Sequence, residues 1–422
     1  MRKIAGAMVE CNSLNNTNEN VVLSKAMDMD MRESFLRYRG SRMKNDDPDF
    51  LAMKEYILSP RCTEDIGKLL RREYDFEPPH HYRVPKNFSN RKRDVYSFKG
   101  DMRHLFKLIN YSMRDYDCRL TKGLYSFRAS VTAKDFLLKL RNFENVGDYY
   151  IVKADVSNYV GSIVPELIIP RLEKLWPDDT ALLDLMKFIL LRRECIERDG
   201  SVVKCEPGGL GGIPLSNYFM NVYLMELDEY FEPRSPLYCR YSDDLIIFAS
   251  SREEAEEYIA FFHKVLREKK LGANPDKTCL IEPGGDVEIL GFTLSNGRMG
   301  ISDHAKRKIM RKIRICARKL IRMKRYEGIS DEEAARKMVY CCNLMFFGGD
   351  GGNEMTWSRW LFPVINDASS LVELDRYTQD AIRYVITGTM ADKRYRIGYQ
   401  QLKDLGYRSL VHAYYHFEHD KA

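Results

Sequence analysis

Two adjacent aspartates, Asp243 and Asp244, lie between two short apolar segments, 237–241 and 245–249. Apolar segments joined by so few residues predict an antiparallel hairpin with the two acids at its turn. Carboxylates this close repel each other and raise each other's pKa, so their pairing needs a physical reason. A bound divalent cation supplies one, and an ordinary aspartate-rich turn is the alternative.

A third acid ends another segment with the character of a strand. Residues 149–155 read Tyr-Tyr-Ile-Val-Lys-Ala-Asp, which is typical of a buried strand with Asp155 at its tip. Mg²⁺ binds a few carboxylates together with water and substrate phosphates, and two such ions clamp the attacking and leaving oxygens of phosphoryl transfer. The three aspartates therefore predict a site for two Mg²⁺ ions, with Mn²⁺ as the alternative metal. We expect Asp155 and Asp243 to bind both ions and Asp244 to bind less directly.

The size and charge of the chain are compatible with an enzyme but do not identify one. Its 422 residues predict two to three domains or one multi-lobed enzyme. The net charge of +6 is too small to indicate a nucleic-acid binder by itself. The ten cysteines show no zinc-ligand spacing, and no apolar run is long enough to span a membrane. We expect a cytoplasmic protein with reduced thiols, no targeting segment and no membrane association.

The rest of the pattern alternates helices with a few strands. Helical periodicity predicts helices at 30–38, 63–74, 101–113, 133–143, 165–193, 216–231 and 253–270, and a basic helical region from 303 onward. Strands are predicted at 149–155, 237–241, 245–249, 274–282 and 287–294. This mixture indicates an α+β fold.

Basic residues are concentrated in two places. The segment 80–98 interleaves Lys and Arg with aromatic residues, and 303–325 carries eleven basic residues against one acid. The apolar residues of the second segment share a helical spacing: Ile309, Ile313, Leu320 and Ile321. This spacing predicts an amphipathic helix whose cationic face binds phosphates in a salt-dependent way. A merely solvated surface is the alternative for both segments.

Five short motifs complete the pattern and follow one another along the chain. They lie at 155–163 (DVSNYVGSI), 212–228 (GIPLS, then NVYL and LD), 241–244 (YSDD), 274–278 (NPDKT) and 290–292 (LGF). Together they resemble the palm motifs of reverse transcriptases, and the resemblance covers roughly residues 80 to 300. It implies a right-hand polymerase with fingers, a palm whose antiparallel sheet is backed by helices, and a helical thumb.

The resemblance also implies how the chain is divided. Residues 1–78 would form an N-terminal helical extension and 79–147 the fingers. Residues 148–300 would form the palm, with 176–215 partly in the fingers, and 301–422 the helical thumb and C-terminal tail.

Individual residues receive roles from the same resemblance. Catalysis falls to Asp155, Asp243, Asp244 and Lys277, and metal binding to Asp155, Val156, Asp243 and Asp244. Nucleotide contacts fall to Lys86, Arg93, Arg128, Tyr159, Val160, Gly211 and Gly212. Primer and template contacts fall to Tyr241, Leu290, Gly291, Phe292, Lys308, Arg311, Lys312 and Arg318. Lys277 would lie near the leaving pyrophosphate, where a cation neutralises charge or donates a proton; a solvated lysine is the alternative.

Two positions depart from the family pattern. Gly211 stands where most relatives have Gln, so that side-chain contact to the nucleotide is absent or comes from elsewhere. Val160 stands where an aromatic residue usually blocks the nucleotide 2′-hydroxyl, with Tyr159 beside it. We therefore expect weaker discrimination against ribonucleotides.

The implied activity is that of an RNA-directed DNA polymerase that copies a structured non-coding RNA into cDNA, uses dNTPs and holds an RNA–DNA duplex. The compact chain and its tail, 405–415, resemble retron and defence-associated reverse transcriptases of prokaryotes, in particular the second defence class, which implies a role against phage. Three alternatives stay open: an RNA-directed RNA polymerase, a protein-primed or untemplated DNA polymerase of the abortive-infection type, and a non-catalytic RNA-binding protein. The intact acids argue against the last. The sequence does not indicate the template, the priming group or the oligomeric state.

Overall fold

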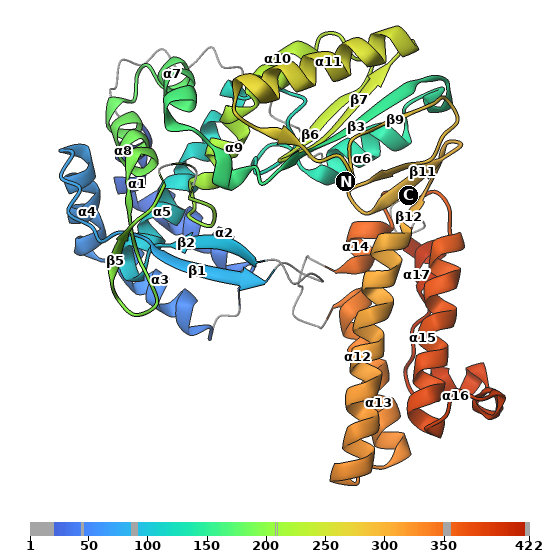
Figure 1. Cartoon of the computed structure of the whole chain (residues 1–422). Coiled ribbons are helices and arrows are strands. Elements are labelled where there is room, and N and C mark those ends of the chain that lie inside the picture. Colours follow the sequence, from blue (N-terminus) through green and yellow to red (C-terminus); the bar gives the residue numbers. More distant parts are fainter. Residues whose placement is uncertain are drawn as a thin grey trace. The chain divides into compact units, whose positions relative to one another are not determined.

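A computed structural model describes residues 21–43, 46–85, 92–206, 208, 210–348 and 356–417 (Figure 1). The chain divides into two compact units. Unit 1 is built from Met1–Thr132 and Ile151–Leu280, and unit 2 from Ala133–Tyr150 and Ile281–Ala422. Helices predominate and most strand pairs are antiparallel, so the predicted α+β fold is confirmed.

Four helices begin the described part of unit 1: α1 (Val21–Met27), α2 (Met29–Gly40), α3 (Pro48–Leu58) and α4 (Pro60–Leu70). Asp28, Asp47 and Ser59 begin α2, α3 and α4, because each side chain accepts a hydrogen bond from a backbone N–H of the first turn. The backbone N–H of Val22 donates to Asp179 Oδ2 at 2.8 Å, and Asp179 also caps α8 (Thr180–Leu191). This bond fastens the N-terminal helices to the rest of unit 1.

A four-stranded sheet follows, with the order β2-β1-β4-β5. The hairpin of β1 (His80–Pro85) and β2 (Lys92–Ser97) lies where the sequence predicts a basic hairpin. A second hairpin consists of β4 (Glu194–Ile196) and β5 (Val202–Lys204). The two hairpins meet in parallel through one residue pair, His80 with Ile196. Helix α5 (Gly100–Ser112) comes directly after β2.

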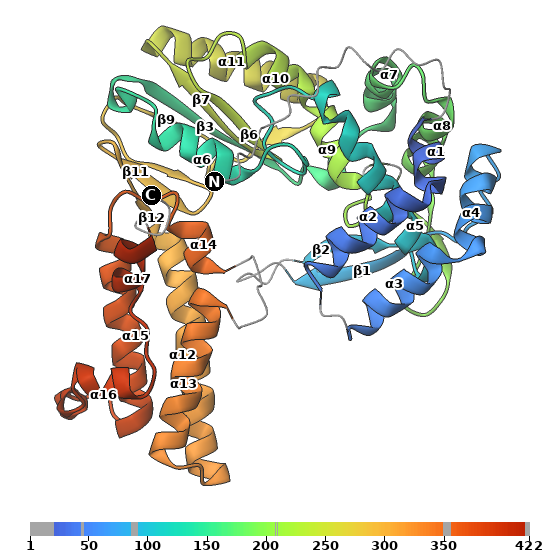
Figure 2. The same ribbon diagram turned by 180° about the vertical axis from the view of Figure 1, so that it is seen from behind.

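The second sheet of unit 1 holds the motifs. Its order is β6-β7-β3-β8, and β9 also pairs with β3; the strands are β3 (Tyr150–Ser157), β6 (Tyr238–Tyr241), β7 (Asp244–Ala249), β8 (Gly272–Ala273) and β9 (Cys279–Ile281). Figures 1 and 2 show α10 (Met225–Phe231) and α11 (Arg252–Glu268) along one face of this sheet. The apolar stripe of α11 is buried there, including Tyr258 and Phe262.

The strand predicted at 274–282 is wrong for its first half. Residues 274–278 form a turn, in which the N–H groups of Lys277 and Thr278 donate to the Asn274 carbonyl at 3.2 and 3.0 Å. The Asn274 side chain also accepts the N–H of Asp276, a turn that Asn and Pro favour locally. Only β9 remains extended.

Unit 2 combines a three-stranded sheet with a helical bundle. The sheet has the order β10-β11-β12, formed by β10 (Val287–Ile289), β11 (Phe292–Ser295) and β12 (Arg298–Ile301), so the strand predicted at 287–294 is in fact a hairpin. The long helix α12 (Asp303–Glu327) packs on α13 (Asp331–Phe347) and α15 (Ser369–Thr387).

The remaining elements connect these layers. They are α6 (Ala133–Arg141), α7 (Pro165–Leu175), α9 (Ser216–Tyr223), α14 (Trp357–Leu361), α16 (Tyr399–Asp404) and α17 (Leu410–Phe417), with 3₁₀ turns at Met113–Arg119, Val146–Asp148, Val160–Ser162 and Asp392–Arg396. Among the described residues, no helix combines the length and the apolar character that crossing a membrane requires.

Candidate active site

The two adjacent aspartates lie at the turn of the β6–β7 hairpin, as the sequence predicts. Tyr241 pairs with Asp244 across the hairpin, so Ser242 and Asp243 form the two-residue loop. Ser242 takes a positive φ of 62°, which a tight two-residue turn requires. The N–H of Val156 in β3 donates to the Asp243 carbonyl at 3.2 Å and holds the turn against the neighbouring strand.

Asp155 of β3 lies beside this turn with both carboxylate oxygens engaged. Lys277 donates from Nζ to Asp155 Oδ1 at 2.8 Å, and Asn274 donates from Nδ2 to Oδ2 at 2.8 Å. The Asn274 N–H also donates to the Asp155 carbonyl at 2.8 Å. The turn at 274–278 therefore brings both Lys277 and Asn274 to the carboxylate.

Two of the three carboxylates, Asp243 and Asp244, are protonated more readily than isolated aspartates. Burial, with the nearby charge of Asp155, raises the pKa of Asp243 even though Lys277 opposes the shift. Burial, the charge of Asp243 and a hydrogen bond to Asp155 raise the pKa of Asp244 to about 7. Burial lowers the pKa of Lys277, but the hydrogen bond and charge of Asp155 outweigh it and the net shift is upward. The positive charge of Lys277 is therefore not sufficient to offset the upward pKa shifts of Asp243 and Asp244.

A buried ion pair lies directly below the turn. Arg240 of β6 and Asp228 of α10 are both 0% exposed, and the guanidinium contacts both carboxylate oxygens. Arg240 also donates to the carbonyls of Ser242 at 3.2 Å and of Asn221 at 2.8 Å. The Tyr238 hydroxyl donates to Asp228 at 2.7 Å. One guanidinium therefore ties the turn, β6, α9 and α10 together.

The loop that contains Ser126 also supports the turn. Ser126 accepts the N–H of Ser242 at its hydroxyl, 2.9 Å away, and donates to Asn221 Oδ1 at 2.9 Å. Next to it, Phe127 has a positive φ of 55°, is 49% exposed, and lies 6.3 Å from the Tyr241 ring between centroids. This arrangement leaves an exposed aromatic face beside the acidic turn.

The two glycines of the second motif lie where side chains would collide with neighbours. A Cβ on Gly211 would come within 2.9 Å of Val160 Cγ1. A Cβ on Gly212, whose φ is +111°, would come within 2.7 Å of the Tyr96 carbonyl oxygen. The Tyr96 N–H also donates to the Gly211 carbonyl at 2.8 Å. Glycine at 211 thus lets β2 and Val160 approach one backbone segment.

These elements match a known family. The family model for reverse transcriptases (RNA-dependent DNA polymerases) matches residues 84–294, half of the chain. The chain belongs to the reverse transcriptase family. Membership predicted from the motif order is therefore confirmed, and the matched range includes the acidic turn, Asp155 and the 274–278 turn.

Individual relatives are more distant. The retron Ec86 reverse transcriptase of Escherichia coli is 28% identical over 106 residues, which cover 24% of this chain and only 33% of that protein. Among solved structures, a telomerase from Candida albicans bound to a fragment of telomeric RNA has a TM-score of 0.43 at 10% identity, over 83% of this chain and 68% of that one. An apo telomerase from Candida tropicalis has a TM-score of 0.44 at 12% identity, over 78% and 64%.

Several residues predicted to contact nucleotide have defined positions. Val160 is partly exposed, whereas Tyr159 is buried and its hydroxyl donates to the Met220 carbonyl. Arg93 is exposed on β2. Arg128 instead donates to the carbonyls of its own loop, at Thr121, Leu124 and Asp117. Lys86 lies outside the described residues.

The motif at 290–292 forms a turn in unit 2. Leu290 and Gly291 both have positive φ, 49° and 88°, and join β10 to β11, so the segment is a hairpin turn and not a bulge. Phe292 is buried. The N–H of Ser302 donates to the Gly291 carbonyl at 3.0 Å, which fixes the turn against the start of α12.

The basic helix of unit 2 separates its apolar and cationic faces. Ile309, Ile313 and Leu320 are buried, as expected, and Ile321 is partly exposed. Nine of the eleven cations are exposed: Arg307, Lys308, Arg311, Lys312, Arg314, Arg318, Lys319, Arg322 and Arg325. Lys306 instead pairs with Asp303 at 2.9 Å, and Lys324 donates to the Val385 carbonyl at 2.7 Å.

Sequence reasoning missed the supports of the site. It did not single out Arg240, Ser126 or a carboxylate contact for Asn274. One signal was available for Arg240: an arginine in the otherwise apolar segment 237–241 implies a buried acidic partner. No comparable signal marks Ser126, because its partner Ser242 lies 116 positions away.

Replacing Arg240 tests the support of the turn. Arg240→Met leaves Asp228 buried without its partner, and we expect the free energy of unfolding to fall by about 3–5 kcal/mol. Urea denaturation would measure the change. Arg37→Met is the matched control, since Arg37 is 69% exposed in its pair with Glu33 and should change stability by about 0.5 kcal/mol or less. Equal losses for the two variants would contradict the assigned role.

Proposed function

We propose that this protein is an RNA-directed DNA polymerase whose active site is the cluster of Asp155, Asp243, Asp244 and Lys277. The observation that carries the proposal is the convergence of three carboxylates and one ammonium group at the turn beside β3. Membership of the reverse transcriptase family supports the same conclusion. Transfer of a nucleotide to a primer end is the reaction that suits such a cluster.

The donor set fits divalent metal ions. Asp155, Asp243 and Asp244 supply the carboxylate oxygens that Mg²⁺ and Mn²⁺ prefer, with the Val156 carbonyl as a further oxygen of the same strand. Partial burial and the charge of neighbouring carboxylates raise the pKa of Asp243 and Asp244, and a bound cation would favour their charged forms. When bound, two such ions would supply charge stabilisation for the attacking and leaving oxygens.

The chain's own residues would orient the reaction. Asn274 holds one Asp155 oxygen, which fixes the rotation of that carboxylate. Lys277 holds the other oxygen, and its ammonium group is half exposed, so it can also face an anionic leaving group. Lys277 would neutralise pyrophosphate or donate a proton to it.

Nucleotide and template contacts would surround this cluster. Val160, Gly211 and Gly212 would lie along the sugar and base of the incoming dNTP, with Arg93 and Lys86 on its phosphates. Burial of the Tyr159 ring favours Val160 over Tyr159 as the residue that meets the sugar. Exposed Phe127 suits stacking of a template base better than the engaged Arg128 does.

Unit 2 would hold the primer and the duplex. We assign primer contact to the 290–292 turn and, as a separate contact on unit 1, to Tyr241. The exposed cations of α12, among them Lys308, Arg311, Lys312 and Arg318, would contact the phosphates of an RNA–DNA duplex. These assignments keep the proposed thumb at residues 301–422, which belong to unit 2, whereas unit 1 contains most of the proposed fingers and palm.

The template and biological role extend the proposal further. We propose that a structured non-coding RNA serves as template and that the cDNA acts in defence against phage. The motif series and the C-terminal tail support this role, as does the local similarity to a retron reverse transcriptase. Retention of all three aspartates favours a working polymerase over an RNA-binding relic.

Replacing Asp243 tests the activity. Asp243→Asn should lower primer extension on an RNA template by about 10²-fold or more, because it removes a charge at the reacting phosphate. Asp199→Asn is the control, since Asp199 lies in an exposed turn and should leave activity unchanged. Sequencing the RNA and DNA that copurify should show cDNA with wild type and not with Asp243→Asn. The same cDNA with both proteins would refute the polymerase assignment.

The same assay separates the alternatives. Extension with rNTPs and not with dNTPs would indicate an RNA polymerase. DNA bonded to a side chain would indicate protein priming, and DNA unrelated to any RNA present would indicate untemplated synthesis.

Charge removal on α12 tests the duplex contact. Lys308→Gln with Arg318→Gln should reduce the slope of log affinity against log salt by about 0.9 per cation, because each phosphate contact releases a counterion. Lys306→Gln with Lys324→Gln removes the same charge from residues that bind within the protein and should change the slope less. The measurement is RNA–DNA duplex binding across a salt series, and equal effects of the two pairs would contradict the assignment.

Enlarging Val160 tests the sugar contact. Val160→Phe should lower ribonucleotide incorporation relative to wild type, because a larger ring would fill space beside the 2′-hydroxyl. Val202→Phe, at a residue 60% exposed on β5, is the control. Primer extension with mixed rNTPs and dNTPs measures the ratio, and unchanged discrimination by Val160→Phe would exclude this role for Val160.

A further inference from the structure

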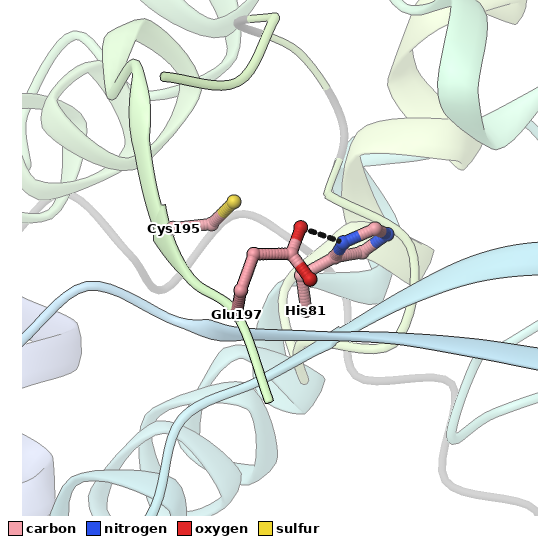
Figure 3. A group of neighbouring side chains, drawn as sticks. All are labelled: His81, Cys195 and Glu197. Carbon is pink, nitrogen blue, oxygen red and sulfur yellow. Dashed lines mark hydrogen bonds and ion pairs between the residues drawn. The ribbon is translucent and has the colours of Figure 1, made fainter. Parts of the chain in front are cut away.

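A second cluster of metal-ligating side chains lies on the four-stranded sheet of unit 1. Figure 3 shows His81 of β1 facing Glu197, which directly follows β4, with Cys195 of β4 beside them. One potential ligand atom from each residue lies within 4.8 Å of the other two. His81 Nδ1 is 2.8 Å from Glu197 Oε1. His81 and Cys195 are buried, at 8% and 2% exposure.

The strand register places these donors on one face. His80 pairs with Ile196 between β1 and β4, so His81, Cys195 and Glu197 all point to the opposite side of the sheet. On the hairpin partner of β4, Cys205 pairs with Arg193 and so shares the face of Cys195. Its thiol hydrogen-bonds that of Cys195. A second thiol therefore adjoins the three-residue cluster.

The other ring nitrogen of His81 already has the partner that a metal-bound histidine needs. His81 Nε2 is 2.9 Å from Asp94 Oδ1 on β2. Histidines that bind metals usually donate their second N–H to a carboxylate, which fixes the ring and the tautomer. The Tyr96 ring stacks on His81, with centroids 5.1 Å apart, and restrains the imidazole further. Nδ1 is thus the nitrogen directed at Glu197 and Cys195.

We propose that His81, Cys195 and Glu197 bind a zinc-type transition-metal ion and that a water molecule completes its coordination. Imidazole nitrogen, thiolate sulfur and carboxylate oxygen are the donors that Zn²⁺ takes in tetrahedral sites. Hard ions such as Mg²⁺ prefer oxygen donors, so this cluster and the aspartates of the active site select different metals. The ion would displace a proton from between Nδ1 and Oε1 and another from the Cys195 thiol.

The position of the cluster gives the site a structural role. The β1–β2 and β4–β5 hairpins meet through one residue pair, and Ile196 donates its N–H to the Pro79 carbonyl at 3.0 Å at this joint. An ion bound by His81 on one hairpin and by Cys195 and Glu197 on the other would fasten the joint directly.

Metal content and a cobalt spectrum test the site. After purification from zinc-supplemented medium and dialysis against buffer with Mg²⁺, wild type should carry about one zinc per chain. Replacement by Co²⁺ should give thiolate-to-cobalt charge-transfer absorption, which the all-oxygen aspartate cluster cannot produce. A zinc-free wild type without this band would overturn the proposal.

Variants locate the ion. Cys195→Ser and His81→Gln should each lose the zinc and most of the charge-transfer band. Cys279→Ser, at an exposed thiol on β9, should keep both. Added Zn²⁺ should raise the melting temperature of wild type and Cys279→Ser but not of Cys195→Ser. A band that persists in Cys195→Ser, or zinc retained by His81→Gln, would refute the assigned ligands; if either variant fails to fold, the wild-type stoichiometry and spectrum still decide.

Discussion

The acidic turn of the β6–β7 hairpin depends on a charge pair from which water is excluded. Arg240 and Asp228 are fully buried, and removing either would leave an uncompensated charge in a low-dielectric interior. The Arg240 guanidinium donates hydrogen bonds to both Asp228 oxygens and to two backbone carbonyls, at Ser242 and Asn221. Those carbonyls belong to the turn and to α9, so satisfying the charge also fixes the backbone that carries the adjacent aspartates. The buried Arg240–Asp228 pair thus helps to fix the backbone of the turn that carries Asp243 and Asp244.

The acidic cluster differs from this ion pair, because its three carboxylates carry like charges that repel one another. Asp243 and Asp244 are partly buried beside Asp155, and their pKa values are raised despite Lys277. Two hydrogen bonds from the 274–278 turn hold Asp155 in place, and Asp244 is hydrogen-bonded to Asp155, so these hydrogen bonds order carboxylates whose charges repel. A site preorganised in this way changes little when cations arrive, which is what an enzyme needs if binding is to favour the reacting state.

Local patterns predict the parts of this site that are continuous in sequence. The hairpin with its acids, the strand that carries Asp155, and the amphipathic α12 all follow from short-range periodicity and turn chemistry, although β3 continues past Asp155 to Ser157. Contacts between distant segments are not encoded in such patterns. The strand predicted at 274–282 fails because Asn274 bonds its own loop and Asp155, 119 positions away, instead of a ladder. Likewise, His81 meets Glu197 across 116 positions, a spacing that resembles no metal motif.

Close packing links the strand hairpin of unit 1 to the predicted nucleotide contacts. The Tyr96 N–H binds the Gly211 carbonyl, and a side chain at 211 would meet Val160. Gly211 stands where most relatives have glutamine, so residue 211 has no side chain that could contact a nucleotide. Tyr96 also stacks on His81, which lies at the joint between the two hairpins. Because Tyr96 contacts both, whatever holds His81 in place also restrains the backbone that adjoins Val160. Tyr96 therefore connects the joint between the two hairpins with the backbone next to Val160, the residue proposed to meet the nucleotide sugar.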